Sequence, residues 1–513
     1  MTAGQSQKDA VVSNRQLIKN ASANYVSLFV AAVIGFVVTP ILVRHLGVST
    51  FGVLGVLEAI VGYLGLLDAG VSTAMVQRVA ALRAVDDVDR LRVTLGTARV
   101  INLISGIVLW VVSVILATIV RSIIHLDGLS ARPVQVALVL LGVSAAIGTS
   151  SVTASAIMFG GGRDDRTALL SLFLGSGSRI LQVLVVLHGG GLVGLCVVST
   201  TSTVISTSSV IWLSRRTFPE LRGAGWTFCR LEASLLLHVG LRNAILATAG
   251  AASYGMDTVI LGAIRTASQV TPYVLAARLV RLVGSLATRG ISTFTPRIAH
   301  QHAQGDLDAG YRSYVAGLFI ALGISLPLEV VFVVFGRPLL RLWLGRVPPH
   351  TYAVLAVFLV LTLAQLVGGQ SSSVLIATQR QKIIARVAVP VALMNVAFSI
   401  LATRRYGPLG PVLGSLPQAV LIEAIVYPVI ACHALGVSAK HLVQDVVVPA
   451  IVIGVLSISV AYIAHVVTRS TSIGSVAIDV IVSLIFGYVV VLGVAMVLWP
   501  SLCRYIRRSI KVR

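Results

Sequence analysis

The sequence contains few charged residues and few cysteines. Asp, Glu, Lys and Arg make up 11% of the 513 residues, whereas a soluble domain usually carries about 25%. So few charges cannot cover a water-exposed surface of this size, and 56% hydrophobic residues are incompatible with a disordered chain. Four widely spaced cysteines, with no Cys-x-x-Cys, exclude a disulfide-rich fold and a zinc site. The remaining class is an all-α polytopic membrane protein.

Enzyme motifs are also missing from the sequence. It contains no P-loop, no His-Glu-x-x-His and no Gly-x-Ser-x-Gly, and its ten histidines are scattered. The loops between apolar segments are too short to hold a soluble catalytic domain. We therefore expect a protein that is not an enzyme and has neither a cofactor nor a metal site.

Apolar runs of about 20 residues predict about fourteen transmembrane helices. Each run must be helical, because lipid offers no partner to a free backbone N–H or C=O group. The predicted organisation is a cytoplasmic N-terminal tail (1–21), an N-terminal six-helix bundle (22–213), a cytoplasmic linker (214–239), a C-terminal six-helix bundle (240–431), two additional helices (446–499) and a basic cytoplasmic tail (500–513).

The basic residues lie mostly in short loops between the apolar runs, and the net charge is +22. Loops on the side of the N-terminus hold 24 Lys and Arg residues, and loops on the other side hold 10. This asymmetry predicts that both termini are cytoplasmic. It also favours anionic membrane lipids and an anionic substrate as partners, and argues against nucleic acid.

Two segments about 220 residues apart are similar to each other. Ala69-Gly70-Val71-Ser72-Thr73 is followed by Arg78-x-Ala80, and Arg289-Gly290-Ile291-Ser292-Thr293 is followed by Arg297-x-Ala299. Chance similarity of short strings in an apolar chain is the alternative. A true repeat predicts two parallel six-helix bundles related by an axis along the membrane normal, with the substrate between them.

The predicted span near residues 271–294 carries three arginines, Arg278, Arg281 and Arg289. At 100° per residue they share one face of a helix. An arginine at the bilayer centre costs about 2.5–3.5 kcal/mol on insertion scales, so this face is expected to line a wet cavity. Guanidinium groups bind phosphate through a planar fork, which favours a phosphate-bearing substrate. Alternatively, Arg278 and Arg281 pair with acids on neighbouring spans and Arg289 reaches the inner surface.

Six other residues complete the set of candidate substrate-binding residues. Asp68 and Asp257 are acids within predicted spans, and each would pair with an arginine or bind a coupling cation. Asn24, near the start of the first span, would cap a helix or contact a headgroup. The remaining candidates are Tyr273, Arg44 and Arg78.

Several short motifs occur in a characteristic order. They are Arg44-His45-Leu46-Gly47, Phe51-Gly52, Asp68-x-Gly70, Arg78-x-Ala80, Asp257-Thr258-Val259-Ile260-Leu261-Gly262, Gly305-Asp306 and Gly407-Pro408-Leu409-Gly410. Over about 400 residues this order resembles the Wzx-type polysaccharide (O-antigen) flippase family of the multidrug/oligosaccharidyl-lipid/polysaccharide exporter superfamily.

The resemblance implies a flippase of the bacterial cytoplasmic membrane. Such a protein moves a polyprenyl-pyrophosphate-linked oligosaccharide from the inner to the outer leaflet by alternating access, for O-antigen or exopolysaccharide synthesis. A polysaccharide polymerase and glycosyltransferases would be its partners. The alternatives are a lipid II flippase or a drug/cation antiporter of the same superfamily, and a membrane-embedded glycan polymerase.

Overall fold

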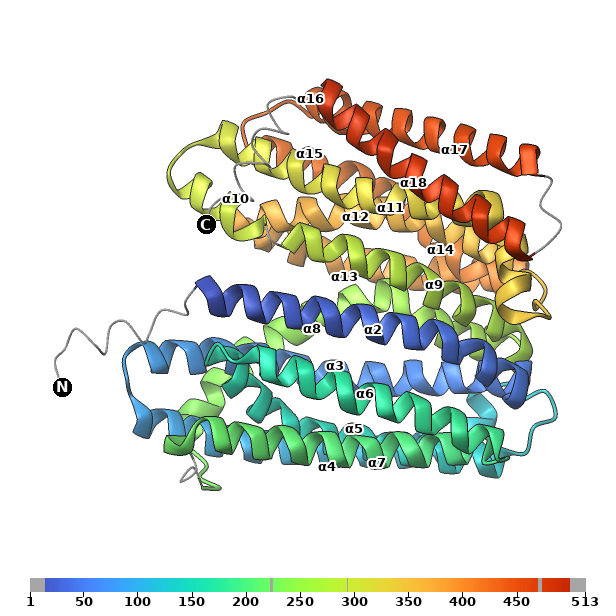
Figure 1. Cartoon of the computed structure of the whole chain (residues 1–513). Helices are drawn as coiled ribbons and strands as arrows, with labels where there is room; N and C mark the ends of the chain where they lie inside the picture. Colours follow the sequence, from blue (N-terminus) through green and yellow to red (C-terminus); the bar gives the residue numbers. More distant parts are fainter. Residues whose placement is uncertain (1–13, 222–224, 293, 469–472, 499–513) are drawn as a thin grey trace. The chain divides into compact units, whose positions relative to one another are not determined.

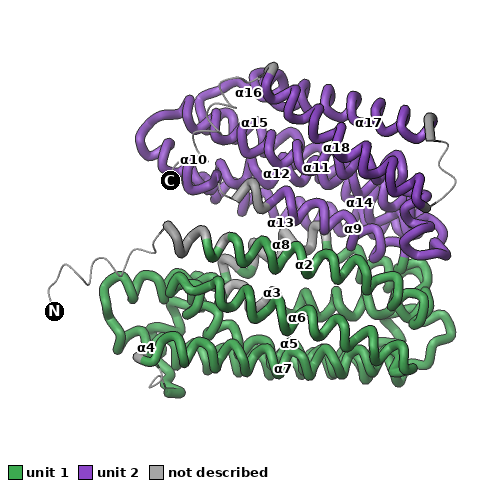
Figure 2. The backbone as a smooth tube through the Cα atoms, viewed as in Figure 1, with its two compact units in different colours: residues 1–271 green, residues 272–513 purple. Residues whose placement is uncertain are grey.

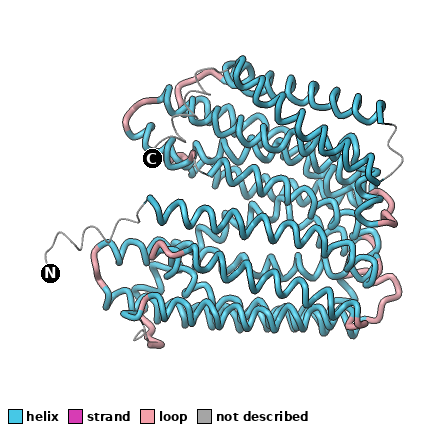
Figure 3. The backbone as a smooth tube through the Cα atoms, viewed as in Figure 1, coloured by secondary structure: helices cyan, strands magenta, loops and turns pink. Residues whose placement is uncertain are grey.

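The computed structural model describes residues 14–221, 225–292, 294–468 and 473–498 (Figure 1). Within these ranges the side chains of some helical residues, including 66–70, 245–254 and 289–292, are not described. The described residues form helices joined by short loops, with no β-strand among them (Figure 3). The predicted all-α fold is confirmed.

The chain divides into two compact units, residues 1–271 and 272–513 (Figure 2). Unit 1 contains α2 (Asn14–Leu46), α3 (Val48–Ala84), α4 (Val88–Ile123), α5 (Ala131–Gly160), α6 (Asp164–Leu187), α7 (Gly191–Thr217), the 3-10 helix η1 (Pro219–Leu221) and α8 (Arg230–Ile264). Helix α8 packs along α3 and so belongs to unit 1 by its contacts, whereas the sequence assigned residues 240–263 to the second bundle. The predicted bundle and tail boundaries stay predictions.

Helix α9 (Ala267–Ser292) begins in unit 1 and continues into unit 2. Unit 2 also contains α10 (Thr295–Ala303), α11 (Leu307–Leu344), α12 (Thr351–Ala377), α13 (Gln381–Tyr406), the 3-10 helix η2 (Gly407–Leu409), α14 (Gly410–Pro417), the π-helix η3 (Gln418–Val426), α15 (Tyr427–Ala434), α16 (Ala439–Leu442), the π-helix η4 (Val443–Val447), α17 (Val448–Thr468) and α18 (Ile473–Leu498).

Twelve helical segments in the described part of the chain are long and apolar enough to cross a membrane. A helix rises 1.5 Å per residue, so about 20 residues span the hydrocarbon core. The protein is therefore a polytopic membrane protein. In α8, the described apolar segment Gly255–Ile264 is shorter than the twelve and is not one of them. The expected total of about fourteen spans stays a prediction.

One of the twelve segments, Gln381–Ala434, is 54 residues long and folds back on itself. The chain reverses at Gly407, whose φ of +58° is a conformation that favours glycine. The returning helix α14 then lies against α13, so closely that a Cβ on Gly410 would collide with the backbone of Thr403, and one on Gly414 would lie 2.5 Å from Ser399 Cα. This segment forms a helical hairpin and accounts for two crossings, and the Gly407–Gly410 motif forms its turn.

The two units share the geometry of their helix–helix turns. Asp86 has a φ of +56° and is followed by Asp87, whose carboxylate accepts a hydrogen bond from the N–H of Arg90 at 3.0 Å and caps α4. Gly305 has a φ of +75° and is followed by Asp306, which caps α11 in the same way through the N–H of Ala309 at 2.9 Å. Both caps are Asp side chains that satisfy a free helix N–H group.

A second pair of turns agrees with the first. Gly162, with a φ of +70°, precedes α6, and Gln379, with a φ of +58°, precedes α13. Helices α4, α5, α6 and α7 begin at residues 88, 131, 164 and 191, and α11, α12, α13 and α14 begin at 307, 351, 381 and 410. Each later helix therefore starts about 220 residues after its counterpart. These turns favour a true internal repeat over chance similarity of the two strings.

In unit 1, the beginnings of α3 and α9 lie in direct contact. Phe51 is completely buried, and a Cβ on Gly52 would collide with the carbonyl oxygen of Ala267. The hydroxyl of Thr271 donates a 2.6 Å hydrogen bond to the carbonyl oxygen of Val48. The Phe51-Gly52 motif therefore has a packing role, because only glycine allows this approach.

Candidate functional site

The candidate residues of unit 2 lie on α9, and three of them, Tyr273, Arg278 and Arg281, lie within the apolar segment Ala267–Thr288. Among the twelve candidate spans in the described part of the chain, this segment is the least hydrophobic, and it contains Arg278 and Arg281. Arg278 is half-buried and Arg281 is exposed. They are three positions apart in the sequence, so their side chains lie about 60° apart around the helix. Arg289 lies outside the residues whose side chains are described.

Tyr273 lies on a different face of α9 from Arg278. Its side chain is 2% exposed, and its ring centroid is 5.0 Å from that of Phe358 on α12, at an angle of 55°. A tilted aromatic pair of this kind is a favourable packing contact. Tyr273 therefore belongs to the packed interior of unit 2 and fixes α9 against α12, about 140° around the helix from Arg278.

In unit 1, Arg78 forms an ion pair that the sequence did not reveal. Its Nη2 and Nε atoms donate to the two carboxylate oxygens of Glu232 at 2.7 and 3.1 Å. Arg90 Nε donates to Glu232 Oε1 at 2.9 Å, and Thr94 Oγ1 donates to Oε2 at 3.1 Å. We call Arg78, Arg90, Thr94 and Glu232 the Glu232 cluster. It joins α3, α4 and the first turn of α8.

The Glu232 carboxylate is held in its charged form. Its side chain is 3% exposed. Burial by itself would raise the pKa of Glu232, but the hydrogen bonds from Arg78, Arg90 and Thr94 outweigh that effect and lower it below the ordinary value. Arg78 is thus occupied in a structural contact, because a paired buried carboxylate needs its cationic partners.

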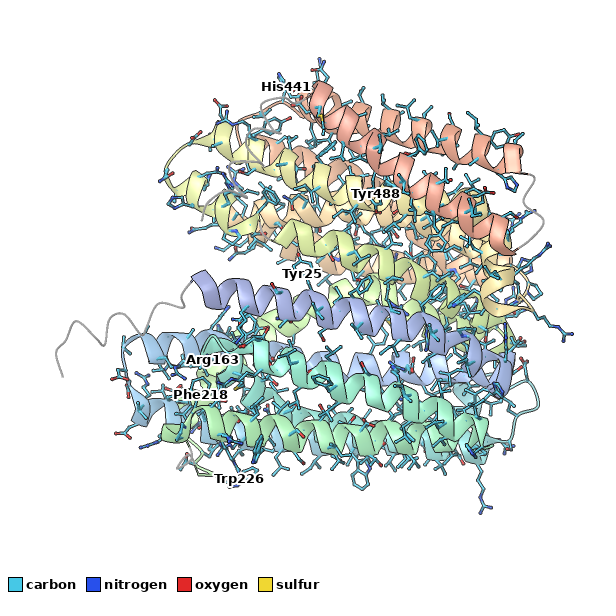
Figure 4. The ribbon with its side chains drawn as sticks, viewed as in Figure 1. Tyr25, Arg163, Phe218, Trp226, His441 and Tyr488 are labelled. Carbon is cyan, nitrogen blue, oxygen red and sulfur yellow. The ribbon has the colours of Figure 1, made fainter. Side chains whose placement is uncertain are left out.

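The loop before α8 is fixed on α4 beside this cluster. The N–H of Cys229 donates to Thr97 Oγ1 at 3.1 Å. A Cβ on Gly96 would collide with the side chain of Thr227 and come within 2.8 Å of the carbonyl oxygen of Gly225, so glycine is required for the loop to approach. Figure 4 shows Phe218 and Trp226, two residues of this connection, at the same end of unit 1 as Arg163.

Asn24 joins α2 to the beginning of α6. Its Nδ2 donates to Asp164 Oδ2 at 2.8 Å. One turn earlier, Asn20 Nδ2 donates to the carbonyl oxygen of Gly162 at 3.1 Å, and its Oδ1 accepts from the N–H of Asp165 at 3.1 Å. The two asparagines therefore form hydrogen bonds at the N-terminus of α6, a neighbouring helix, and do not cap the N-terminus of their own helix.

Asp257 and Arg44 occupy contrasting environments in unit 1. Asp257 on α8 is buried and interacts electrostatically with Tyr63 of α3. The Tyr63 hydroxyl lies against Gly255, where a Cβ would collide with it. Arg44 is exposed in the last turn of α2. The side chain of Asp68 lies outside the described residues.

The structure thus gives the unit 1 candidates separate surroundings. Arg78 contacts Glu232, Asn24 contacts Asp164, and Asp257 lies near Tyr63. Among the described residues, no group of three or more His, Cys, Asp or Glu side chains could hold a metal ion. Sequence reasoning missed Glu232 because 154 residues separate it from Arg78, and no local pattern connects the two.

Comparison with known proteins places this arrangement in a family. The family described as polysaccharide biosynthesis protein matches residues 17–302, more than half of the chain. No curated protein matches the chain.

Several solved structures share the fold at low sequence identity. The chain is similar to the lipid II flippase MurJ in an inward closed conformation, with a TM-score of 0.72 and 13% identity over 95% of this chain and 100% of MurJ. For an inward-facing multidrug resistance MATE transporter, the TM-score is 0.68 and the sequence identity is 15%, over 79% of this chain and 95% of that one. For a MOP superfamily transporter from Pyrococcus furiosus, the TM-score is 0.61 and the sequence identity is 16%, over 85% of this chain and 98% of that one.

The chain thus shares its fold with a transporter of the MOP superfamily and with the lipid II flippase MurJ, and these structural neighbours are not enzymes. The match over residues 17–302 covers α3 to α8 in full, including the Glu232 cluster, and continues through α9 with Arg278 and Arg281. This chain belongs to the polysaccharide biosynthesis protein family.

Proposed function

We propose that the protein is a flippase that moves a polyprenyl-pyrophosphate-linked oligosaccharide from the inner to the outer leaflet of the bacterial cytoplasmic membrane. The observation that carries the proposal is the pair of arginines, Arg278 and Arg281, within the apolar segment of α9. Both termini would be cytoplasmic, and the product would feed O-antigen or exopolysaccharide synthesis. Glycosyltransferases would supply the substrate and a polysaccharide polymerase would consume it.

Arg278 and Arg281 have the chemistry that a diphosphate requires. Each guanidinium presents several N–H donors in a plane, which matches two oxygens of one phosphate group. A guanidinium within a span is costly unless water or an anion surrounds it. A diphosphate bound between the two side chains would accept hydrogen bonds from both, while the polyprenyl chain stays in lipid and the sugars stay in water.

The other candidate residues have supporting roles in this proposal. Tyr273 fixes the orientation of α9 through Phe358, and Arg78 holds the helices of unit 1 together through Glu232. Arg44, Arg289, Asp68 and Asp257 stay predicted contacts of the substrate or of a coupling cation. Asn24 ties α2 to α6 and thereby fixes the beginning of the first span.

The membrane potential would favour the proposed direction of transport. The cell interior is negative, so an anion gains free energy when it moves outward. The gain is ~2.3 kcal/mol per charge per 100 mV, or ~4.6 kcal/mol for two charges that cross the full field. Protein charge that moves with the substrate would reduce this gain.

Family membership and fold support the proposal. The family is one of polysaccharide biosynthesis, and MurJ, which shares the fold, is by its name a lipid II flippase. The MATE transporters share the fold as well, and they are multidrug resistance proteins. An antiporter for cationic drugs would need acids at the place where α9 carries Arg278 and Arg281.

Cells that depend on this protein for glycan export provide the test. Replacing both Arg278 and Arg281 with alanine should leave lipid-linked repeat units on the inner leaflet, where an impermeant glycan-modifying reagent cannot reach them. Arg386→Ala, at an exposed arginine of α13, is the matched control and should export normally. Normal export by the double variant at normal protein level would contradict the proposal. Rescue of a strain that lacks its lipid II flippase would favour that alternative substrate.

A further inference from the structure

A cavity of about 280 Å³ lies within unit 1, and none of the residues that line it belongs to α9. It is formed by α4, α5, α7 and the loop that precedes α8. Trp226 of that loop lines it and is 67% exposed; the residue is labelled in Figure 4. The charge asymmetry of the sequence predicts that this end of unit 1 lies at the cytoplasmic surface, because Arg90, Arg92, Arg215 and Arg216 are among the basic residues assigned to that side.

Two guanidinium groups line this cavity, those of Arg99 on α4 and Arg215 on α7. No Asp or Glu is found among its described lining residues. The cavity therefore has a positive lining and favours an anion. Phosphate groups are the anions that paired arginines bind best, because their oxygens accept several N–H donors at once.

A buried amide in the cavity points to a second feature of the ligand. Asn102 is only 1% exposed and lines the cavity. Its Nδ2 donates to Thr153 Oγ1 at 2.9 Å, but its Oδ1 has no hydrogen-bond partner among the described residues. A buried acceptor without a donor is unfavourable. A ligand hydroxyl group near the phosphate would supply the missing hydrogen bond.

The surface beside the cavity is apolar and continuous. Leu103 lines the cavity and is one helical turn after Arg99, at the start of a stripe of exposed apolar side chains along α4. The stripe consists of Leu103, Ile104, Ile107, Val108, Val111 and Ile115. In a transmembrane helix such a stripe faces acyl chains, and an exposed tryptophan such as Trp226 is typical of the membrane–water interface.

We propose that this cavity binds the headgroup of an anionic phospholipid that carries a hydroxyl group, of the phosphatidylglycerol type. Arg99 and Arg215 contact the phosphate, the amide of Asn102 accepts a hydrogen bond from the glycerol hydroxyl, and the acyl chains lie along the α4 stripe. The bound lipid would join α4, α5 and α7 at the inner leaflet. This site is separate from the proposed substrate site and does not depend on it.

The test measures lipid binding to the purified full-length protein by native mass spectrometry. Phosphatidylglycerol should bind at least about tenfold more tightly than zwitterionic phosphatidylcholine, and also more tightly than phosphatidylmethanol, which has the same charge but no hydroxyl group. Arg99→Gln with Arg215→Gln should remove the preference over phosphatidylcholine. Asn102→Ala should remove only the preference over phosphatidylmethanol.

A matched double variant controls for the loss of two positive charges. Arg121→Gln with Arg132→Gln alters two exposed arginines at the opposite end of α4 and the start of α5, and should bind phosphatidylglycerol like the wild type. Equal binding of the three lipids by the wild type would overturn the proposal, and this arm needs no variant to fold. Displacement of phosphatidylglycerol by millimolar inorganic phosphate would also overturn it, since the site would then take free phosphate.

Discussion

Glu232 connects three helices at one end of unit 1. Its carboxylate accepts hydrogen bonds from α3 and α4 while it stands in the first turn of α8. A negative charge near a helix N-terminus is favourable in itself, because the free N–H groups there carry partial positive charge. One side chain therefore stabilises three helices.

Replacing Glu232 with glutamine should reduce the stability of the protein. The substitution keeps the shape but removes the charge that Arg78 and Arg90 share. We expect a fall of about 1–3 kcal/mol in the free energy of unfolding, measured by chemical denaturation in detergent. Asp89→Asn is the control, because the Asp89–Arg92 pair is exposed and its loss should cost less than about 1 kcal/mol. Equal effects of the two substitutions would contradict the role of the Glu232 cluster.

The contribution of Glu232 should also depend on pH in a defined direction. Its pKa is lowered in the folded protein, so the unfolded chain takes up the proton first as the pH falls. The stabilisation is complete above the ordinary pKa of glutamate, about 4.3, and is lost as the pH falls through the lower folded pKa. The stability difference between the wild type and Glu232→Gln should therefore shrink below about pH 4. A difference that grows on acidification would contradict this.

Gly52 offers a second test at a single position. Gly52→Ala places a methyl group against the carbonyl oxygen of Ala267 and should destabilise the protein by about 1–3 kcal/mol, seen as a lower midpoint of thermal unfolding. Gly62→Ala on the same helix is the control, since nothing lies within 4 Å of its added Cβ. That control should leave stability unchanged or slightly higher, because alanine favours helix. The account fails here if Gly52→Ala is as stable as Gly62→Ala.

Single residues show where sequence reasoning succeeds and where it stops. The sequence located Arg78 and Asn24, but the partners that explain them, Glu232 and Asp164, are 154 and 140 residues away. Tyr273 was among the predicted substrate contacts, and its packing against Phe358 became visible only in the structure. Long-range partners depend on tertiary packing, which hydropathy does not encode.

The helices were easier to predict from the sequence than the way in which they pack against one another. A run of about 20 apolar residues has to be helical in lipid, so composition alone predicts the element. The positions of the turns follow from local chemistry as well, as Asp87 and Asp306 show by capping α4 and α11. The placement of α8 in unit 1 did not follow from the sequence, since its contact with α3 joins segments far apart in the chain.

The hairpin at Gly407 predicts a sidedness that labelling can measure. Helix α13 separates Lys382 from Arg405, and its 26 residues span about 39 Å. With the four native cysteines replaced, Arg405→Cys should react with a membrane-impermeant maleimide added to whole cells. Lys382→Cys should react only after the cells are permeabilised, and it serves as the internal control. Labelling of both positions from the same side would show that α13 does not cross the membrane.

The two units have helices of similar order and turns of the same geometry, which is the expected result of a duplicated ancestor. A transporter that acts by alternating access needs two such halves that can move as bodies. Each unit has its own buried core, with Met75 and Leu95 in unit 1 and Tyr314 and Val374 in unit 2. The packing inside each unit is therefore compatible with movement of that unit as a rigid body.

The proposed direction of transport predicts a response to voltage. In proteoliposomes, a potential that is negative on the substrate side should accelerate transfer of the diphosphate-linked lipid, because the moving headgroup is an anion. A neutral lipid-linked saccharide transferred by the same protein serves as the control and should not respond. Equal rates at both polarities for the diphosphate lipid would contradict a voltage-driven step.

The transfer rate of a polyprenyl-pyrophosphate-linked oligosaccharide in proteoliposomes tests the central claim most directly. The wild type and the control Arg386→Ala should transfer the lipid at equal rates. The double variant Arg278→Ala with Arg281→Ala should be slower by about tenfold or more, because it lacks the charged hydrogen-bond donors for the diphosphate. A double variant that folds, reconstitutes and transfers the lipid as fast as the wild type would contradict the account.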